Sequence, residues 1–464
     1  MFKRALDPEA EVFIVTAAQN ATPVHEGFWG VLKQIEKDRN AEIIVIPIRY
    51  KNPTSRWTQS QANEETWVEE VKPYLWNVRK KLCENLMILG DIKTQPTASD
   101  PITGFDAISG SASAILGHTK VQMKCVPTPS YHMAKILTTT GACTKPNYTD
   151  SRAGKLGEFH HALAAVLIEV KGKKFFLRHI HFDNKTQSVT DLNTRYFADH
   201  AEEAPRPEAL VMGDTHRDSI DPDVERATFG EGGIVETVRP RRLVWNDLLD
   251  AYAVNPHHKG NPFIAFGKML ANRGSIEDEV RRACEYVRSK TVGDIESVIV
   301  PSNHNDFLRR WIMSNDWRLD PLNARYYIRT VGAMLESVNM SARGMECADP
   351  FALSFPQFVD MSGIKLLADD ESYQVSGVEL GMHGDRGPNG ARGSARNLRR
   401  IGVKSIIGHS HSPCIEEGAY QTGTSTYLRL EYNSGPSSWM NAHVLLHADG
   451  KRQVIFVIDG DWRI

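Results

Sequence analysis

The feature that most constrains the fold of this chain is a series of short segments with metal-ligand side chains. Most of these segments follow a short apolar run. The run 210–212 stops at Gly213 and is followed by Asp214 and His216. In an extended segment, residues i and i+2 point to the same side, so these two side chains can converge on one ion. Alone this is a common strand end, but it is the first of five such segments, and four of the five follow an apolar run. The segments are 210–216, 243–247, 298–305, 381–385 and 408–411.

Length and composition limit the class of protein. At 464 residues the chain is too long for one ordinary core, which predicts two domains. It has 41% apolar and 24% charged residues and no apolar run of membrane-spanning length, so we expect a soluble protein without a membrane partner. The first ten residues lack a signal-peptide core, and the six cysteines are scattered, which favours the reducing cytoplasm of a bacterial or host cell. A homo-oligomer remains open.

Residues 1–200 are predicted to form an α/β domain whose role the sequence does not indicate. Alternation of strand-like and helix-like apolar patterns favours a parallel unit followed by less regular structure and a closing hairpin. Residues 201–208, rich in proline and glutamate, are predicted to be a linker. The expected elements are strands 12–15, 43–48, 86–89 and 121–126, helices 26–37 and 64–84, a loop at 138–155, and a hairpin of strands 164–170 and 174–180.

Residues 209–464 are predicted to form a second domain, in which strands and helices alternate before a tail of antiparallel strands. The expected strands are 209–213, 243–247, 296–300, 374–382, 405–407, 427–432, 443–447 and 454–458. The expected helices begin near residue 220 and span 275–288, 305–313 and 324–340.

The order Asp-x-His, Asp, Asn-His, a single His and Gly-His-x-His resembles that of the calcineurin-like metallophosphoesterase superfamily. The resemblance covers residues 210–439, about half of the chain. It implies two β-sheets packed face to face inside a helical shell, an αββα arrangement of the α/β class. It also implies one metal bound by Asp214, His216 and His411, a second bound by Asn303, His383 and His409, Asp247 bridging the two, and His304 facing the leaving group.

The chemistry of phosphodiester cleavage suits these residue types. Two divalent ions roughly 3.5–4 Å apart neutralise the ester, activate the attacking water and stabilise the departing oxygen. Carboxylate, amide and imidazole ligands without thiolate favour Mn²⁺, with Fe²⁺, Zn²⁺ or Mg²⁺ as alternatives. A histidine that binds no metal, such as His304, can protonate an alkoxide leaving group.

The sequence departs from the family pattern at two places. Asn246 precedes the bridging Asp247 where the family usually has glycine, and the neighbouring Asp250 is expected to lie in a following helix. Asn305 follows His304 where the family usually has an acid. An amide supports an imidazolium less than a carboxylate does, so we expect slower turnover or a shifted pH optimum.

An arginine-rich segment suggests the substrate. No acidic residue lies between Arg386 and Lys404, and planar guanidinium groups bind phosphate in a bidentate manner. Several arginines near one centre favour a polyanion, although a solvated helix face with acidic partners elsewhere in the chain is the alternative. The candidate phosphate-binding residues are Arg386, Arg392, Arg396, Arg399 and Arg400.

Some histidines outside this series could be mistaken for ligands. His118 lies in a partial copy of the motif, but Lys120 stands where a second histidine would be needed. The pairs His160-His161 and His179-x-His181 are interpreted as structural histidines.

The pattern favours a two-metal phosphodiesterase, with a DNA nuclease as the first hypothesis. In chemistry it is similar to the superfamily's double-strand-break repair nucleases, and it also resembles early DNA-degrading proteins of tailed phages. The alternatives are a phosphatase or small-nucleotide phosphodiesterase, and a non-enzymatic scaffold. Eight ligating or catalytic groups argue against the scaffold, because a scaffold has no physical need of them.

Overall fold

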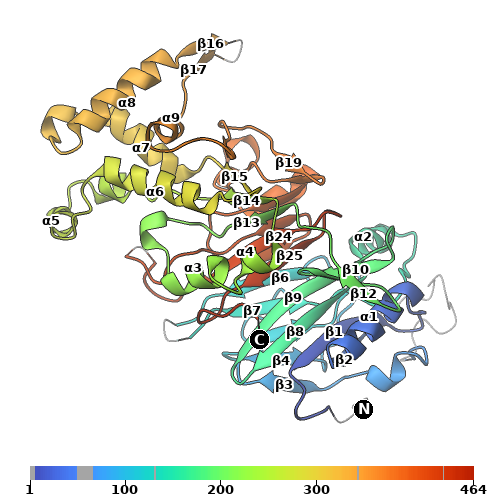
Figure 1. Ribbon diagram of the computed structural model, residues 1–464. Coiled ribbons are helices and arrows are strands. Elements are labelled where there is room, and N and C mark those ends of the chain that lie inside the picture. The colour runs from blue at the N-terminus through green and yellow to red at the C-terminus, as the bar shows by residue number, and fades with distance from the viewer. Residues whose placement is uncertain (1–5, 50–65, 130–131, 342–343, 432, 464) are drawn as a thin grey trace.

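The computed structural model describes residues 6–49, 66–129, 132–341, 344–431 and 433–463, which form a mixed α/β structure (Figure 1). The strands of these residues form sheets of seven, ten, six and two members. None of the helices in the described ranges combines the length and apolar composition needed to traverse a bilayer.

The seven-stranded sheet contains the unit predicted at the N-terminus. β1 (Val12–Gln19) pairs in parallel with β2 (Glu42–Ile48), and α1 (Glu26–Asp38) connects them. α1 packs one apolar face on the sheet, and the His25 imidazole caps its first turn by accepting from Phe28 N. The predicted hairpin is confirmed. The remaining strands are β8 (Ala164–Lys171), β9 (Lys174–Asp183), β10 (Ser188–Asp191), β11 (Thr194–Tyr196) and β12 (Ala201–Glu203).

The ten-stranded sheet joins the two halves of the chain. β22 pairs antiparallel with β6, placing Ile415 opposite Met123. The predicted boundary at 201–208 therefore does not separate the sheets, and β12 occupies part of the predicted linker. In sheet order the strands are β19 (Gln374–Val375), β20 (Val378–Glu379), β21 (Lys404–Ile407), β23 (Ala419–Gln421), β22 (Cys414–Glu416), β6 (Gln122–Val126), β7 (Lys135–Thr139), β5 (Ser113–Leu116), β4 (Leu86–Leu89) and β3 (Arg79–Cys83).

The six-stranded sheet packs on the ten-stranded sheet through one face. Alternate residues of a strand point to opposite faces, so Val244 enters the core shared with Ile406 and Ile415, while Leu243 and Trp245 face the helices. In order, the strands are β18 (Ile364–Leu366), β15 (Glu296–Ile299), β14 (Arg242–Trp245), β13 (Ala209–Val211), β24 (Ala442–Leu446) and β25 (Arg452–Phe456).

Helices cover the outer face of the six-stranded sheet and extend beyond it, with α8 at the end of the molecule opposite the N-terminal strands (Figure 1). They are α3 (Pro222–Phe229), α4 (Ile234–Val238), α6 (Ile276–Lys290), α7 (Asn303–Ser314), α8 (Ala324–Glu336) and α9 (Pro350–Phe358). The other elements are α5 (Pro262–Leu270), the short α10 (Ala395–Leu398), and the two-stranded β16 (Asn339–Ser341) and β17 (Gly344–Glu346).

Four predicted elements are wrong, the first being the single strand expected at 374–382, which a turn at 376–377 divides into the antiparallel strands β19 and β20. The helix expected at 64–84 is, from residue 66 onward, a turn, one 3₁₀ turn at Lys72–Tyr74 and the edge strand β3. Its helically spaced Trp67, Val71 and Leu75 are buried by docking against β1 and β2, with Trp67 Nε1 donating to Ala18 O. The loop expected at 138–155 begins with the end of β7 and ends in α2 (Arg152–His160). Residues 427–431 form no strand, and the last residue of that prediction lies outside the described ranges.

Candidate metal centre

The predicted ligands lie where strands of two sheets end. Asp214 follows β13 and Asp247 follows β14, while Asn303 opens α7 after β15. From the ten-stranded sheet, His383 follows β20 and both His409 and His411 follow β21. Side chains at the carboxyl ends of adjacent strands converge, which is how ligands from distant parts of the sequence meet.

One group consists of Asp214, His216, Asp247 and His411, all buried, whose candidate ligand atoms lie within 4.8 Å of one another. Asp214 Oδ2 is 3.0 Å from His411 Nε2, and His216 Nε2 is 3.2 Å from His411 Nε2. His216 Nε2 is 3.8 Å from Asp247 Oδ2. Two imidazole nitrogens and two carboxylates thus surround one point.

A second group consists of Asp247, His383 and His409, so the two groups share Asp247. His383 Nε2 lies 3.1 Å from Asp247 Oδ2. Asn303 joins this group, because its Oδ1 lies 3.1 Å from His409 Nδ1. The structure therefore brings together all seven predicted ligands, and each lies in the group in which it was expected.

The unsatisfied atoms of these groups fit metal ions. Burial without a hydrogen-bond partner is costly for a polar atom, and such atoms are rare in folded proteins. Here both carboxylate oxygens of Asp214, Oδ1 of Asp247, Nε2 of His383 and Nδ1 of His411 are buried without a partner of hydrogen-bond geometry. When several ligand atoms point their lone pairs at one cation, they lie close to one another without the geometry of hydrogen bonds. These buried His and Asp clusters could hold a metal ion.

The pKa shifts of the ligand side chains also agree with a metal site. Burial alone would raise the pKa of Asp247, but His383 and His304 hold it well below its usual range. Burial opposes protonation of His383, yet Asp247 raises the pKa of His383 to about 9. The pKa of His216 is likewise raised to about 9, against burial, by Asp250 and Asp247. Protons on these imidazoles balance the carboxylates, and a divalent ion would replace that positive charge.

Four of the ligands have left-handed backbone conformations, with φ of 37° at His216, 41° at Asp247, 79° at His409 and 57° at His411. Such conformations are strained for residues other than glycine and cluster at functional sites. Main-chain hydrogen bonds hold them, including one of 2.7 Å from His216 N to Asp247 O. The strand ends are therefore fixed before any ligand binds.

Gly408 shows how tightly the centre is packed. A Cβ atom at this residue would lie 2.2 Å from Asp214 Oδ1 and 3.0 Å from Asn246 Cβ. We therefore expect Gly408→Ala to displace Asp214 and to weaken metal binding by roughly 10-fold to 100-fold, the usual effect of disturbing the groups that orient a ligand. Metal titration followed by calorimetry measures this.

Gly418→Ala is the matched control, because the nearest atoms to its added Cβ are 3.7 and 3.9 Å away. It should bind metal as the parent does. Equal metal affinity in Gly408→Ala and the parent would contradict the placement of Asp214 in the centre.

His304 lies beside the first group, and with His216 and Asp250 it forms a third cluster whose candidate ligand atoms lie within 4.8 Å of one another. Its ring centroid is 4.6 Å from that of His216, and its Nδ1 donates to the main-chain oxygen of Asp250 at 2.8 Å. This bond fixes the tautomer and leaves Nε2 as the reactive nitrogen. Burial lowers the pKa of His304, and Asp247 and Asp250 oppose that effect.

Two orienting residues escaped the sequence analysis. Asp250 lies in an irregular segment, not in a helix as expected, and its carboxylate is 3.5 Å from His216 Nδ1 and 3.6 Å from His304 Nδ1. Asn246 Oδ1 lies 3.3 Å from His383 Nδ1. A signal was present, since Asn246 departs from the family pattern and Asp250 is a second acid close to Asp247, but only the fold shows what they contact.

Some arginines of the arginine-rich segment form ion pairs in the fold and others do not. Arg399 pairs with Glu416 at 2.9 Å, Arg386 with Asp306 at 3.3 Å, and Arg396 with Asp100 at 3.8 Å. The acidic partners predicted as the alternative therefore exist for three of the five arginines. Arg392 and Arg400 are exposed and form no ion pair with any described residue.

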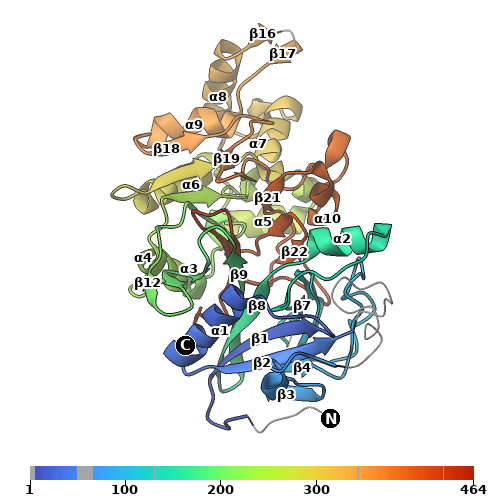
Figure 2. The ribbon, with the colours of Figure 1, turned by 90° about the vertical axis from the view of Figure 1, so that its right-hand side faces the viewer.

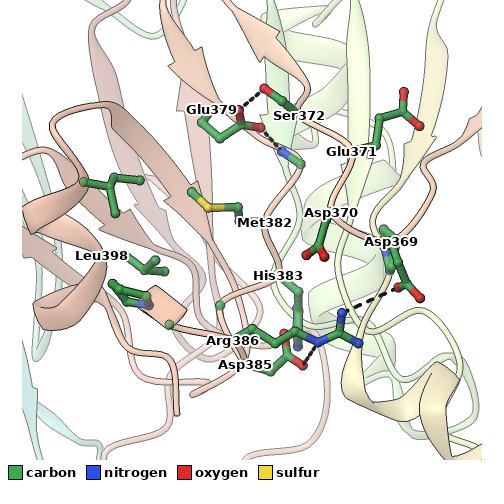
Figure 3. Close-up of a pocket in the computed structure, with 16 residues that line it drawn as sticks. Asp369, Asp370, Glu371, Ser372, Glu379, Met382, His383, Asp385, Arg386 and Leu398 are labelled. Atoms are coloured by element: carbon green, nitrogen blue, oxygen red, sulfur yellow. Dashed lines mark hydrogen bonds and ion pairs between the residues drawn. The ribbon is translucent and has the colours of Figure 1, made fainter. Parts of the chain in front are cut away.

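A cavity of about 320 Å³ adjoins the centre at His383 (Figure 3). Its wall carries more acids than bases: Asp369, Asp370, Glu371, Glu379 and Asp385 against Arg386. Arg386 contacts Asp369 and Asp385 there, as Figure 3 shows. Such a wall repels a free phosphate, so this cavity does not suit a phosphoester.

The fold and the centre define a mixed α/β protein with buried clusters that could hold a metal ion. The chain is similar to Protein A1 of Escherichia phage T5, with 27% identity over 457 residues that cover 96% of this chain and 81% of that protein. No family model matches the chain, and no solved structure matches it.

Proposed function

We propose that the protein is a two-metal phosphodiester hydrolase that acts on DNA. The observation that carries the proposal is the pair of ligand groups that share Asp247, with His304 outside both of them and grouped instead with His216 and Asp250. The packing of the six-stranded on the ten-stranded sheet, with helices outside, supports an αββα metallophosphoesterase fold. Carboxylate, amide and imidazole ligands without thiolate support Mn²⁺.

In this proposal Asp214, His216 and His411 would hold one ion, Asn303, His383 and His409 the other, and Asp247 both. The ions would supply charge neutralisation and an activated water. His304 would give the proton at Nε2 to the departing oxygen, while the main-chain oxygen of Asp250 accepts from Nδ1. The Asp250 carboxylate, 3.6 Å away, stabilises the imidazolium and so supplies the acid that is missing after His304 in the sequence.

DNA is favoured as the substrate by the two unpaired arginines. Arg392 and Arg400 flank α10 and remain available to backbone phosphates. The first test is incubation with Mn²⁺ and linear duplex, circular duplex and single-stranded DNA, bis-p-nitrophenyl phosphate and a phosphomonoester. Cleavage of DNA and of the diester is expected. Hydrolysis of the monoester alone would replace the proposal with a phosphatase.

The two unpaired arginines can be tested together. Arg392→Gln/Arg400→Gln should weaken DNA binding and reduce the slope of log affinity against log salt by about one unit for each phosphate that the variant no longer binds. Hydrolysis of bis-p-nitrophenyl phosphate should be unchanged, because this ester has no backbone to hold. Fluorescence anisotropy over a range of salt concentrations measures the slope.

Arg399→Gln is the contrasting variant, because Arg399 is already paired with Glu416. It should lower the melting temperature and leave the salt slope of DNA binding unchanged. A double variant of Arg392 and Arg400 that binds DNA with the parental slope would exclude these residues as the site of DNA binding.

A further inference from the structure

A second cavity, of about 780 Å³, lies away from the metal centre and is lined by both halves of the chain. It is bounded by α2, β22 and the segment after α10, which Figure 2 shows side by side. Lys404 opens β21 at this cavity, whereas His409 follows the other end of the same strand. The cavity and the metal centre are therefore at opposite ends of β21.

Three neighbouring cations of the cavity wall, Lys404, Lys451 and Arg452, have no carboxylate partner among the described residues. Arg452 is buried, and its guanidinium donates to the main-chain oxygens of Ser405 and Gly418 while stacking 4.0 Å from the Tyr420 ring. Neither Lys404 nor Lys451 forms an ion pair with a described residue. Arg452 is a buried charge without a carboxylate partner, Lys451 is half-buried and Lys404 is exposed, so the three together can receive an anion.

The pKa shifts of the groups near these cations agree with the cations lying close together. Burial lowers the pKa of Lys404, and Arg452 and Lys451 lower it further. His181 at the same wall has its pKa held well below its ordinary value by burial, with His179, Lys451, Arg452 and Lys404 contributing. The nearby Asp449 is exposed, and its negative charge only partly offsets the lowering of the Lys404 pKa.

Two further cations of the cavity wall do have a carboxylate partner. Lys120 and Arg399 are balanced by Glu417 at 2.9 and 3.5 Å. Next to them Phe159 of α2 is 82% exposed, a rare state for a phenylalanine, and Phe182 lines the inner wall. Aromatic side chains and unpaired cations on the wall of one cavity suit a ligand with a flat base and a phosphate.

We propose that this cavity binds a nucleotide, with its phosphates on Lys404, Lys451 and Arg452 and its base near Phe159. The volume lies within the range of roughly 300–1,000 Å³ that is usual for small-molecule sites. A nucleic-acid strand is disfavoured, because the unpaired cations lie close together instead of along a track. The site is independent of the proposed hydrolase, since it uses none of its residues.

Calorimetry on the full-length protein tests this, with EDTA present so that the metal centre takes no part. ADP should bind, and adenosine and inorganic phosphate should each bind more weakly because each lacks either the phosphates or the base. Lys404→Gln/Lys451→Gln should weaken ADP binding by roughly 100-fold, about 10-fold for each charge-assisted hydrogen bond removed. Phe159→Ala should weaken ADP but not phosphate.

The matched control is Lys37→Gln/Lys171→Gln, which removes two exposed lysines that form no ion pair with a described residue and lie outside the cavity. It should bind ADP as the parent does, and both double variants should keep the Mn²⁺-dependent hydrolysis of bis-p-nitrophenyl phosphate. Absence of ADP binding by the parent, equal binding of ADP and phosphate, or loss of DNA affinity in place of ADP affinity would each overturn the nucleotide site.

Discussion

Asp247→Ala is expected to lower Mn²⁺-dependent diester hydrolysis by roughly 10³-fold or more, because metal ions contribute several kcal/mol to such transition states. Asp247 is the residue shared by the two ligand groups. Its loss removes the negative charge that opposes the imidazoles of both groups and that would hold both ions. Elemental analysis of the dialysed protein should therefore show loss of metal together with loss of activity.

Asp369→Ala is the control for this change. Asp369 lines the neighbouring cavity and lies 3.5 Å from Arg309, but it belongs to neither ligand group. Exposed ion pairs of this kind contribute little to stability, so the variant should fold, bind metal and hydrolyse the diester as the parent does. Parental activity in a folded Asp247→Ala protein would remove the basis of the proposed function.

His304→Ala is expected to retain its metal ions and to lose about 10² to 10⁴ in turnover, the usual contribution of a general acid. Metal binding and turnover should respond differently, because Nδ1 of His304 donates a hydrogen bond to the main-chain oxygen of Asp250. Single-turnover kinetics with metal-loaded protein measures the loss. Loss of metal in this variant would make His304 a ligand instead.

His257→Ala is the matched control, because His257 packs on the same Phe307 ring as His304 but is exposed. Asp250→Asn adds a readout of positioning. Asp250 raises the pKa of His304, so its neutralisation should lower that pKa further. The protonated imidazole is the active form, and the alkaline limb of the pH–rate profile should move to lower pH.

The candidate ligands could be predicted because the order of their motifs in the sequence resembles that of the metallophosphoesterase superfamily, and the apolar runs before most motifs indicate where those ligands lie. Apolar runs bury themselves as strands, and a polar residue directly after such a run must lie at the strand's end. Asp214, Asp247 and His409 are therefore placed by local pattern. The unit of β1, α1 and β2, and the β8–β9 hairpin, were predictable for the same reason: their apolar periodicity and turn residues are local signals.

Features that depend on contacts between distant segments could be learned only from the folded chain. Helical spacing at Trp67, Val71 and Leu75 was overridden by docking on β1 and β2. The pairing of β22 with β6 merged two predicted domains into one sheet, because edge strands satisfy their hydrogen bonds with whichever strand lies beside them. Asp250 became the partner of His304 because the chain after β14 turns back toward the centre. Arg399 was withdrawn from the phosphate-binding set because Glu416 lies 2.9 Å away.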